Sequence, residues 1–344
     1  MKIDIIDNID DFKHLESVWN KLYNQISERT VFQSFDFNYY SWNYCLDNYK
    51  NNLVLVLVYN NSVLQAICPF YIDRRRRLRF INDSHSDSCD ILSIVNLDID
   101  IILEYIYNNF KIHVFYLTNL KVNSCILKYK PLFFDYFLDE FSAIYSVLDL
   151  NKGIFPDNFS EYKSKQKTEF RRILKKHKSS RHKILDCETD RFPLDEIYYL
   201  RSIMIENGIR SHDFLSPEQL KLIENLYIQG KIIISAVECE KKFTAISFVL
   251  NEADRYLIWI DLYDSSKMIN LFNYISLLSS LSLNRAIHIN FGRGDYDYKI
   301  SNFLAKKMNL TSFYIFTSKK YKLMFYTEFF VLKYLKKMYN IFKR

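Results

Sequence analysis

The spacing of apolar positions in the second half of the chain predicts a regular series of elements. Two β-rich runs, residues 231–237 and 243–251, flank a polar turn, and residues 256–262 form a third run. After Asp264-Ser265-Ser266 the spacing becomes helical. The full predicted order is helices at 194–207 and 217–229, the three strands, a helix, a strand at 286–291, a helix at about 298–308 and a strand at 311–317.

The first half contains a hairpin with the same pattern. Residues 53–59 and 63–71 align with residues 231–250 at an offset of 179 positions, which places Ala66 on Ala245. Apolar hairpins resemble one another by chance, so this match alone is weak support for an internal duplication.

The composition is that of a folded chain. Of its 344 residues, 49% are hydrophobic and 25% are charged, which excludes a disordered protein. The longest unbroken apolar stretch, residues 53–59, is far shorter than the ~20 residues that cross a bilayer. Acidic residues also stand near the N-terminus, where a signal peptide would have its apolar core. We therefore expect a cytoplasmic protein.

The cysteines, histidines and glycines limit the kinds of site that this chain can contain. The six cysteines form no C-x-x-C pair and the seven histidines are dispersed, so we expect reduced thiols and no bound metal. Because glycine is so scarce, each one is expected where the backbone excludes a side chain. The five glycines are Gly153, Gly208, Gly230, Gly292 and Gly294.

Positive charge is concentrated in two segments. Residues 161–183 contain ten bases against two acids, whereas the net charge of the whole chain is +7. Residues 319–344 contain eight bases against one acid, interleaved with apolar side chains. The first segment either meets an anionic partner or forms a solvated helix face. The second either lies as a basic amphipathic helix on an anionic membrane or packs on the domain with its basic face outward.

Four segments carry a likeness to a known family. Its most distinctive part is a strand that ends in a Gly-x-x-x-Tyr-Lys turn. The four are Val31-Phe32-Gln33-Ser34 with Trp42, Gln65-Ala66-Ile67-Cys68-Pro69-Phe70 with Leu78-Arg79-Phe80-Ile81, the basic residues 167–176, and Ile289-Asn290-Phe291-Gly292-Arg293-Gly294-Asp295-Tyr296-Asp297-Tyr298-Lys299. With this element order, the chain resembles the GCN5-related N-acyltransferases (GNAT), in the CelD-like branch named for cellulose biosynthesis. That branch is distantly similar to the FemAB aminoacyltransferases.

The resemblance implies an α/β fold with mixed sheets and two tandem GNAT-like halves. In this fold two adjacent parallel strands separate and leave backbone groups for an acyl donor; here they would be residues 256–262 and 286–291. A cap-like Asn158-x-x-Glu161 predicts the start of the basic helix. The expected regions are an N-terminal half at 1–150, a linker with the basic helix at 151–190, an acyltransferase half at 191–318 and a basic C-terminal helix at 319–344.

The resemblance also implies that acyl-CoA, usually acetyl-CoA, is the donor. Free N–H groups at the helix that opens near Ser265 would suit its pyrophosphate, and Lys267 would add a positive charge. Related chains usually have glycine in this turn, whereas this chain has none between 265 and 269. The implied donor-binding residues are Trp259, Ile260, Leu262, Ser265, Ser266, Lys267, Met268 and Ile269.

Acyl transfer requires a neutral amine, a polarised thioester carbonyl and a proton for the leaving thiolate. Tyr296 or Tyr298 is suited to give the proton. Asp295, or Asp261 at the strand end, is suited to take the proton of the amine.

An anionic group of the substrate needs positively charged partners. The implied substrate-binding residues are Arg293, Lys299, Arg171 and Arg172. For Lys299 and Asp295, an ion pair that holds the glycine turn is an equal alternative.

We therefore expect an N-acyltransferase that acts on the amine of a sugar or a cell-envelope precursor. One alternative is aminoacyl transfer from charged tRNA, the one case in which nucleic acid is expected as a partner. FemAB enzymes often insert a long coiled-coil hairpin, whereas the basic helix here is single and short. The other alternative is a non-catalytic protein that binds the inner face of the membrane.

Overall fold

Two units make up the chain, and each draws on separate stretches of the sequence. The computed structural model describes residues 1–47, 49–128, 132–252, 255–265, 269–284, 286, 288–328 and 331. Unit 1 contains Met1–Ser27, Leu46–Ser142 and Leu310–Arg344, and unit 2 contains Glu28–Cys45 and Ala143–Asn309. These bounds differ from the contiguous regions expected from the sequence, because the division falls inside two strands, β7 (Tyr136–Asp149) and β13 (Lys306–Phe316).

Unit 1 combines short helices with antiparallel hairpins. Its strands are β1 (Lys2–Ile6), β2 (Asn52–Asn60), β3 (Val63–Ile72), β4 (Arg77–Phe80), β5 (Leu92–Ser93) and β6 (Val114–Lys121). Its helices are α1 (Ile9–His14), α2 (Glu16–Asn24), α4 (Ile99–Asn109) and α5 (Cys125–Lys128).

Unit 2 contains the longer helices. They are η1 (Val31–Gln33), α3 (Phe35–Tyr40), the π-helix η2 (Ser41–Cys45), α6 (Ser164–Lys176), α7 (Leu194–Glu206), α8 (Pro217–Ile228), α9 (Asn270–Leu283) and α10 (Asp297–Ser301). The strands are β8 (Arg181–Leu185), β9 (Ile232–Cys239), β10 (Lys242–Glu252), β11 (Arg255–Tyr263) and β12 (His288–Arg293).

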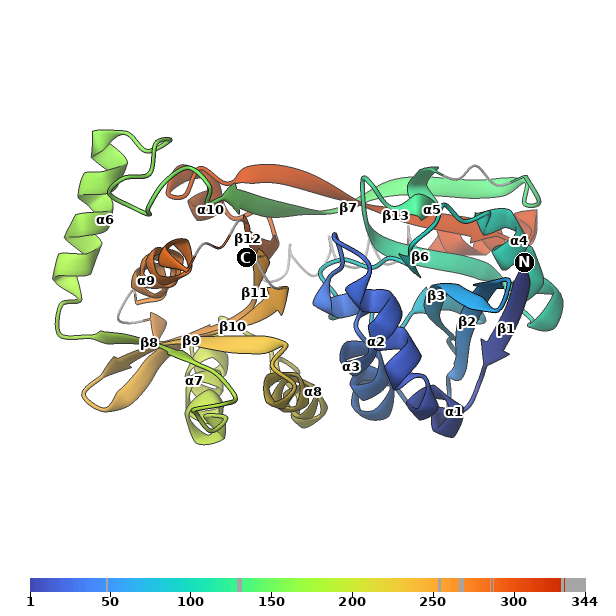
Figure 1. Ribbon diagram of the computed structural model, residues 1–344, viewed down its shortest axis with the longest axis horizontal. Helices are drawn as coiled ribbons and strands as arrows, with labels where there is room; N and C mark the ends of the chain where they lie inside the picture. Colours follow the sequence, from blue (N-terminus) through green and yellow to red (C-terminus); the bar gives the residue numbers. More distant parts are fainter. Residues whose placement is uncertain are drawn as a thin grey trace. The chain divides into compact units, whose positions relative to one another are not determined.

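Each unit has a mixed sheet with a parallel pair in it. The strand order is β1-β2-β3-β4-β6-β13 in unit 1 and β8-β9-β10-β11-β12-β7 in unit 2 (Figure 1). The parallel pairs are β4 with β6 and β11 with β12. The last strand in each order, β13 or β7, is antiparallel to its neighbour and comes from the other half of the sequence.

The predicted hairpin repeat is confirmed, and its register is conserved at the offset of 179. It extends to the strand that pairs with each hairpin at its outer side. The matched pairs are Val58–Ala66 with Val237–Ala245, Leu57–Ile67 with Ala236–Ile246, and Lys2–Tyr59 with Arg181–Glu238. The two halves therefore share a mixed α/β arrangement, as the resemblance implied.

Three local predictions need correction. The helix expected at 298–308 ends at Ser301, because the chain from Lys306 onward pairs as β13. The basic segment is not one helix, since α6 ends at Lys176 and the chain then enters β8. The cap is also displaced from Asn158: α6 begins at Ser164, preceded by the backbone N–H of Lys163, which donates to the Gln166 side chain at 3.1 Å.

Helices cover both faces of the unit 2 sheet (Figure 1). Helices α7 and α8 pack on one face, and their buried residues form a core cluster with Ile234, Phe248 and Leu262. Helices α6 and α9 pack on the other face around Val237 and Ile289. A side chain in the middle of this sheet therefore lies under one helical layer or the other.

Candidate active site

The parallel strands β11 and β12 separate toward their carboxyl ends. Pairing begins at Arg255 and, within the described part of the chain, ends where Leu257 lies opposite Asn290. Strand β11 nevertheless continues to Tyr263, and β12 continues to Arg293. The separation expected between these two strands is therefore present.

A β-bulge in β11 directs Asp261 toward α9. The register between β10 and β11 shifts between Phe248 and Val249, which leaves Trp259 as an extra residue. One extra residue moves every later side chain to the opposite face of the sheet. Leu262 consequently packs in the α7–α8 cluster, and Asp261 lies on the α9 face.

Polar side chains form a row across the α9 face of the sheet. Ser247 of β10 lies opposite both Ser235 of β9 and Asp261 of β11, and we call these three residues the polar row. Ser247 Oγ donates to Asp261 Oδ1 at 2.6 Å. Asn273 of α9 lies above the row: its Nδ2 donates to Ser247 Oγ at 3.0 Å, and its Oδ1 accepts from Ser235 Oγ at 2.7 Å. His182 Nε2 of β8 contacts Ser235 Oγ at 2.9 Å.

Two tyrosines continue from the other oxygen of Asp261. Tyr274 Oη donates to Asp261 Oδ2 and lies 3.2 Å from Tyr298 Oη. When Asp261 is ionised, Tyr274 donates its single hydroxyl proton to the carboxylate. Tyr298 is therefore the donor in the contact between the two tyrosine hydroxyls. Tyr298 and Tyr274 thus form a chain of hydrogen-bond donors that ends at the Asp261 carboxylate, which accepts.

Burial sets the ionisation of these groups. It raises the pKa of Asp261, whereas hydrogen bonds from Ser247 and Tyr274 and the positive charges of Lys299 and Arg210 act in the opposite direction. Burial raises the pKa of Tyr298 far above its usual range, which keeps its hydroxyl protonated. Burial also lowers the pKa of His182 to about 4, so this imidazole is neutral at pH 7.

A pocket with a volume of about 350 Å³ adjoins the two tyrosines. It lies at the carboxyl end of β11 and is bounded by α6, by the first turns of α9 and by α10. Its outer wall carries cationic side chains of α6, and its inner wall is aromatic. The lining residues are Glu169, Arg172, Ile173, Lys176, His177, Tyr263, Ser265, Asn270, Leu271, Tyr274, Tyr298 and Asn302.

The donor-binding residues implied by the resemblance fall into three groups. Ser265 lines the pocket. Trp259, Ile260 and Leu262 of β11 pack in the α7–α8 cluster, which places their backbones rather than their side chains at the separated strands. Ile269 directly precedes α9 and is buried in the cluster on the other face. Ser266, Lys267 and Met268 lie outside the described residues.

Lys299 holds the glycine turn. Its side chain is buried, and Nζ donates to the carbonyl oxygens of Gly292 at 3.0 Å, Arg293 at 3.3 Å and Gly294 at 3.3 Å. All five glycines of the chain have positive φ, as their scarcity predicted, and Gly294 has φ +115°. Three carbonyl contacts give Lys299 a structural task in the turn, distinct from direct contact with a substrate anion.

The remaining candidates, apart from Arg172, lie outside the pocket lining. Asp295 pairs with Lys307 at 2.5 Å instead of with Lys299. Tyr296 is half exposed, and its ring stacks on that of Tyr298 with centroids 6.0 Å apart. Arg293 ends β12, and Arg171 is an exposed residue that pairs with Asp157 at 2.8 Å. Of the four substrate-binding candidates, Arg172 lines the pocket; it also pairs with Glu169 at 2.6 Å.

Sequence reasoning missed Tyr274, Asn273 and the two serines of the polar row. A signal was available for Asn273 and the two serines, because each of them interrupts an otherwise apolar run. Hydrophobic strands and helices rarely bury polar groups without partners. The register that the turn between β9 and β10 sets would place Ser247 opposite Ile234, and the bulge between Phe243 and Ala245 shifts Ser247 opposite Ser235.

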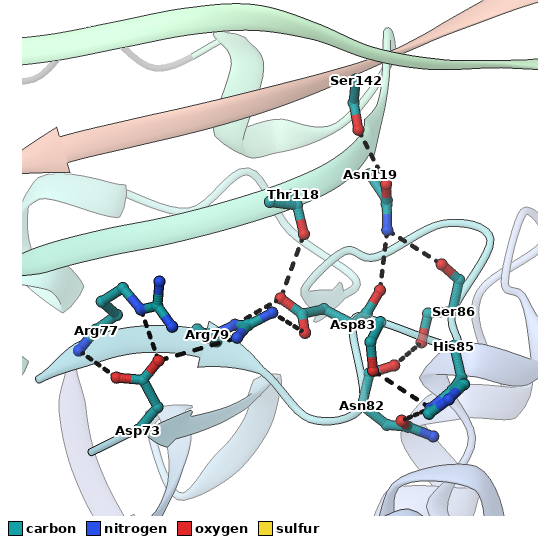
Figure 2. A network of polar contacts seen from close by, with 11 residues as sticks. Asp73, Arg77, Arg79, Asn82, Asp83, His85, Ser86, Thr118, Asn119 and Ser142 are labelled. Carbon is teal, nitrogen blue, oxygen red and sulfur yellow. Dashed lines mark hydrogen bonds and ion pairs between the residues drawn. The ribbon is translucent and has the colours of Figure 1, made fainter. Parts of the chain in front are cut away.

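Unit 1 has a different polar cluster where β4 meets β6 (Figure 2). Arg79 Nε and Nη2 donate to the two carboxylate oxygens of Asp83 at 3.0 and 2.8 Å. Thr118 Oγ1 of β6 donates to Asp83 Oδ2 at 3.3 Å, and Asn119 Nδ2 donates to the Asp83 carbonyl at 3.0 Å. These contacts join the end of β4 to β6 directly.

The expected C-terminal helix is described in part. Residues 319–328 are helical, and Phe325 packs on Tyr314 and Phe316 of β13 with ring centroids 4.9 and 5.2 Å apart. Apart from Val331, the rest of the segment lies outside the described residues. Among the described helices, none is both long and apolar enough to cross a bilayer. Nor do the described residues include a cluster of side chains suited to a metal ion.

Comparison with solved structures identifies the fold. FemX superposes with a TM-score of 0.62 at 9% identity, covering 94% of this chain and 99% of FemX. The C-terminal domain of a putative lysylphosphatidylglycerol synthetase from Agrobacterium fabrum gives 0.60 at 10% identity, with 92% and 96% covered. A tandem GNAT protein from the clavulanic acid biosynthesis pathway gives 0.50 at 8% identity, with 91% and 98% covered. The chain has a tandem GNAT-like fold.

The likeness concerns the fold, and it rests on structure alone. No protein-family model matches the sequence, and no curated protein matches it.

Proposed function

We propose that the chain is an N-acyltransferase of the CelD-like branch, whose second unit transfers an acyl group, usually acetyl, from acyl-CoA to an amine. The acceptor in this proposal is a sugar or a cell-envelope precursor. The observation that carries it is the chain of hydroxyls from Asp261 through Tyr274 to Tyr298, which ends at a pocket beside two separated parallel strands.

The donor would occupy the pocket and the adjoining gap between β11 and β12. An acyl-CoA is long and carries several phosphates, and the cationic wall of the pocket suits such a molecule. Arg172 and Lys176 of α6 lie on that wall, and Asn270 lies opposite at the first turn of α9. Glu169 is the acidic member of the lining, and its pair with Arg172 would have to open for a phosphate to bind.

The hydroxyl chain can move the one proton that the reaction must relocate. The amine loses a proton as its nitrogen bonds to the thioester carbonyl carbon, and the sulfur gains one as the C–S bond breaks. In the first step the amine proton passes to Tyr298, while Tyr298 and Tyr274 each pass one proton toward Asp261, which becomes a carboxylic acid. The reverse transfer protonates the thiolate and returns Asp261 to its carboxylate.

Calorimetry with acetyl-CoA and longer acyl-CoAs tests the donor. We expect binding that weakens several-fold in Arg172→Ala, because an exposed ionic contact contributes about 1 kcal/mol. Arg171→Ala is the matched control, since Arg171 is adjacent in sequence but lies outside the pocket lining. Absence of binding by every acyl-CoA would remove the proposal.

Aminoacyl transfer from charged tRNA is the second candidate, favoured by the likeness to FemX and by the basic helix α6. In that case tRNA should bind tightly at low salt, and its affinity should fall steeply as salt rises, because phosphate contacts release counterions. Weak binding that does not respond to salt, together with tight binding of acyl-CoA, would exclude this candidate.

A further inference from the structure

His182 and the two serines of the polar row have apolar counterparts in unit 1, although the strands match. At the offset of 179 positions, His182, Ser235 and Ser247 correspond to Ile3, Val56 and Cys68. The same register holds in both units: Val56 lies opposite Cys68 as Ser235 lies opposite Ser247. In unit 1 these positions belong to or pack on a hydrophobic core, so the fold itself does not need polar groups there.

The hydrogen bonds of the row have one direction. Asn273 Nδ2 also donates to the backbone carbonyl of Ser235 at 3.3 Å, which fixes the amide so that Oδ1 accepts from Ser235 Oγ. Because the Ser235 hydroxyl donates its single proton to Asn273 Oδ1, Ser235 Oγ can only accept from His182. The neutral imidazole of His182 must therefore donate from Nε2 to Ser235 Oγ. Ser247 likewise accepts from Asn273 and therefore donates to Asp261. Every bond between side chains of this series thus runs toward the carboxylate.

We propose that His182, Ser235, Asn273 and Ser247 form a positioning array that directs a hydroxyl donor onto Asp261 and holds this buried side chain as the proton acceptor of the Tyr298–Tyr274 chain. This rests on the proposed function and adds to it residues that touch no substrate. They act through Asp261 alone. The array spans four elements, from β8 to α9, and its far end lies outside the pocket lining.

Other groups around Asp261 must be distinguished from the array. Tyr274 of α9 donates to its second oxygen, and Tyr298 lies beyond Tyr274. Lys299 of α10 and Arg210, which follows α7, face it with positive charge, and both favour the carboxylate. None of these four is changed in the variants below.

The direct test is the titration of Asp261 by carbon NMR of protein labelled at the aspartate carboxyl groups. Asp261→Asn identifies the signal by its loss. Ser247→Ala removes the donor to Oδ1, and we expect the Asp261 titration to move upward by about one pH unit, because a hydrogen bond to an ionised group is worth that much. Ser279→Ala is the matched control, since Ser279 also lies on the sheet-covering helix α9 but donates to the Ile275 carbonyl.

The far end of the array is tested at His182. His182→Phe cannot donate to Ser235, so we expect a smaller upward movement of the same titration, whereas His182→Gln retains an N–H donor and should stay near the wild type. Ser235→Ala provides an independent variant if His182→Phe unfolds. An Asp261 titration that is unchanged in Ser247→Ala, or equal shifts in the Phe and Gln variants, would overturn the array.

The NMR titration of Asp261 requires neither an acyl donor nor an amine substrate. If the titrations behave as expected while no acyl-CoA binds, the array stands and the proposed function fails. If acyl-CoA binds and the titrations do not move, the function stands and the array fails. Where turnover is measurable, Ser247→Ala should shift the acidic limb of its pH profile with little change in KM, a pattern that a purely structural defect would not produce.

Discussion

The two units place different chemistry at the carboxyl end of the same parallel pair. In unit 1, Arg79 and Asp83 form a two-point ion pair that Thr118 joins to β6, and the strands are tied together there (Figure 2). In unit 2, the strands separate, and Asp261 is bonded to hydroxyls that lead to a pocket. A buried carboxylate is thus satisfied by a fixed cation in one unit and by neutral donors in the other.

This difference bears on what each carboxylate can do. When a carboxylate is paired twice with a guanidinium, both of its oxygens already accept hydrogen bonds from a cation, which makes it a poor proton acceptor. Its role is then to hold the fold together. A carboxylate surrounded by hydroxyls can accept a proton through them. We therefore expect unit 1 to be structural and unit 2 to carry turnover, although the strand register is the same.

The largest expected effect comes from removing each carboxylate in turn. Asp261→Asn should lower turnover by about 10²–10⁴, the usual range for a lost acid or base, with a modest effect on stability. Asp83→Asn should instead lower the free energy of unfolding by on the order of 3 kcal/mol, since it removes the two-point partner of the buried Arg79 and leaves this guanidinium the longer ion pair with Asp73 at 3.9 Å. Steady-state kinetics and denaturant unfolding of both variants check this. Equal losses of turnover would break the distinction between the units.

Removal of one hydroxyl tests whether the two tyrosines carry the proton. Tyr298→Phe deletes the group that reaches the pocket but keeps the ring stacked on Tyr274, whose centroid is 5.8 Å away. We expect turnover to fall by about 10², with the unfolding midpoint almost unchanged. Tyr296→Phe is the control, because Tyr296 lies outside the pocket lining. If turnover is unaffected in Tyr298→Phe, the proton takes another route.

The glycine turn should show an intermediate effect on both properties. Gly294→Ala puts a side chain at φ +115°, and the new Cβ would lie 2.4 Å from the Tyr296 ring. We expect a loss of about 1–2 kcal/mol in the free energy of unfolding and a parallel loss of turnover, because the turn precedes Tyr298. Gly208→Ala, where a Cβ meets nothing within 4 Å, carries the backbone strain without the clash. Similar results for the two variants would assign the whole effect to backbone strain.

The last expected effect, which vanishes near neutral pH, is a pH dependence specific to unit 2. The pKa of His182 is lowered to about 4 in the folded chain, below the ordinary 6.5, so the unfolded chain binds the proton first as pH falls. The free energy of unfolding should therefore decrease from pH 6.5 to pH 4, with a slope approaching about 1.4 kcal/mol per pH unit, and flatten below. His182→Gln should lack this component. The measured quantity is the difference in the free energy of unfolding between the wild type and His182→Gln at each pH. This difference removes the contribution of the buried Asp90, whose pKa is raised to about 6 and which acts in the opposite direction.

Much of the fold of unit 2 could be predicted from its apolar spacing. The strands β9, β10 and β11 and the helices α7 and α8 lie where the pattern placed them, because long periodic runs bury one continuous face. The helix after Tyr298 was overestimated, since residues 306–308 have helical spacing but pair as β13. Pairing with a distant strand is a tertiary effect that local pattern does not contain.

The candidate site was predicted in part. The carboxylate Asp261 and the hydroxyl of Tyr298 were singled out from strand ends and the glycine turn, and they belong to one hydrogen-bonded chain. Tyr274, which connects them, was missed, because in the sequence it is one more aromatic residue of an apolar helix. That Lys299 holds the glycine turn was one of two alternatives, but its expected partner was Asp295, since the three carbonyl oxygens become its neighbours only when the turn has formed.

The last strand of each sheet, β13 or β7, comes from the other half of the sequence, and this affects folding during synthesis. Unit 1 receives residues 310–316 next to β6, so its sheet lacks a strand until these residues have left the ribosome. During synthesis β6 would remain an unprotected edge, which is a template for intermolecular pairing. A fragment that stops at residue 150 should therefore aggregate when expressed alone, and separate addition of a peptide with the β13 sequence should reduce that aggregation.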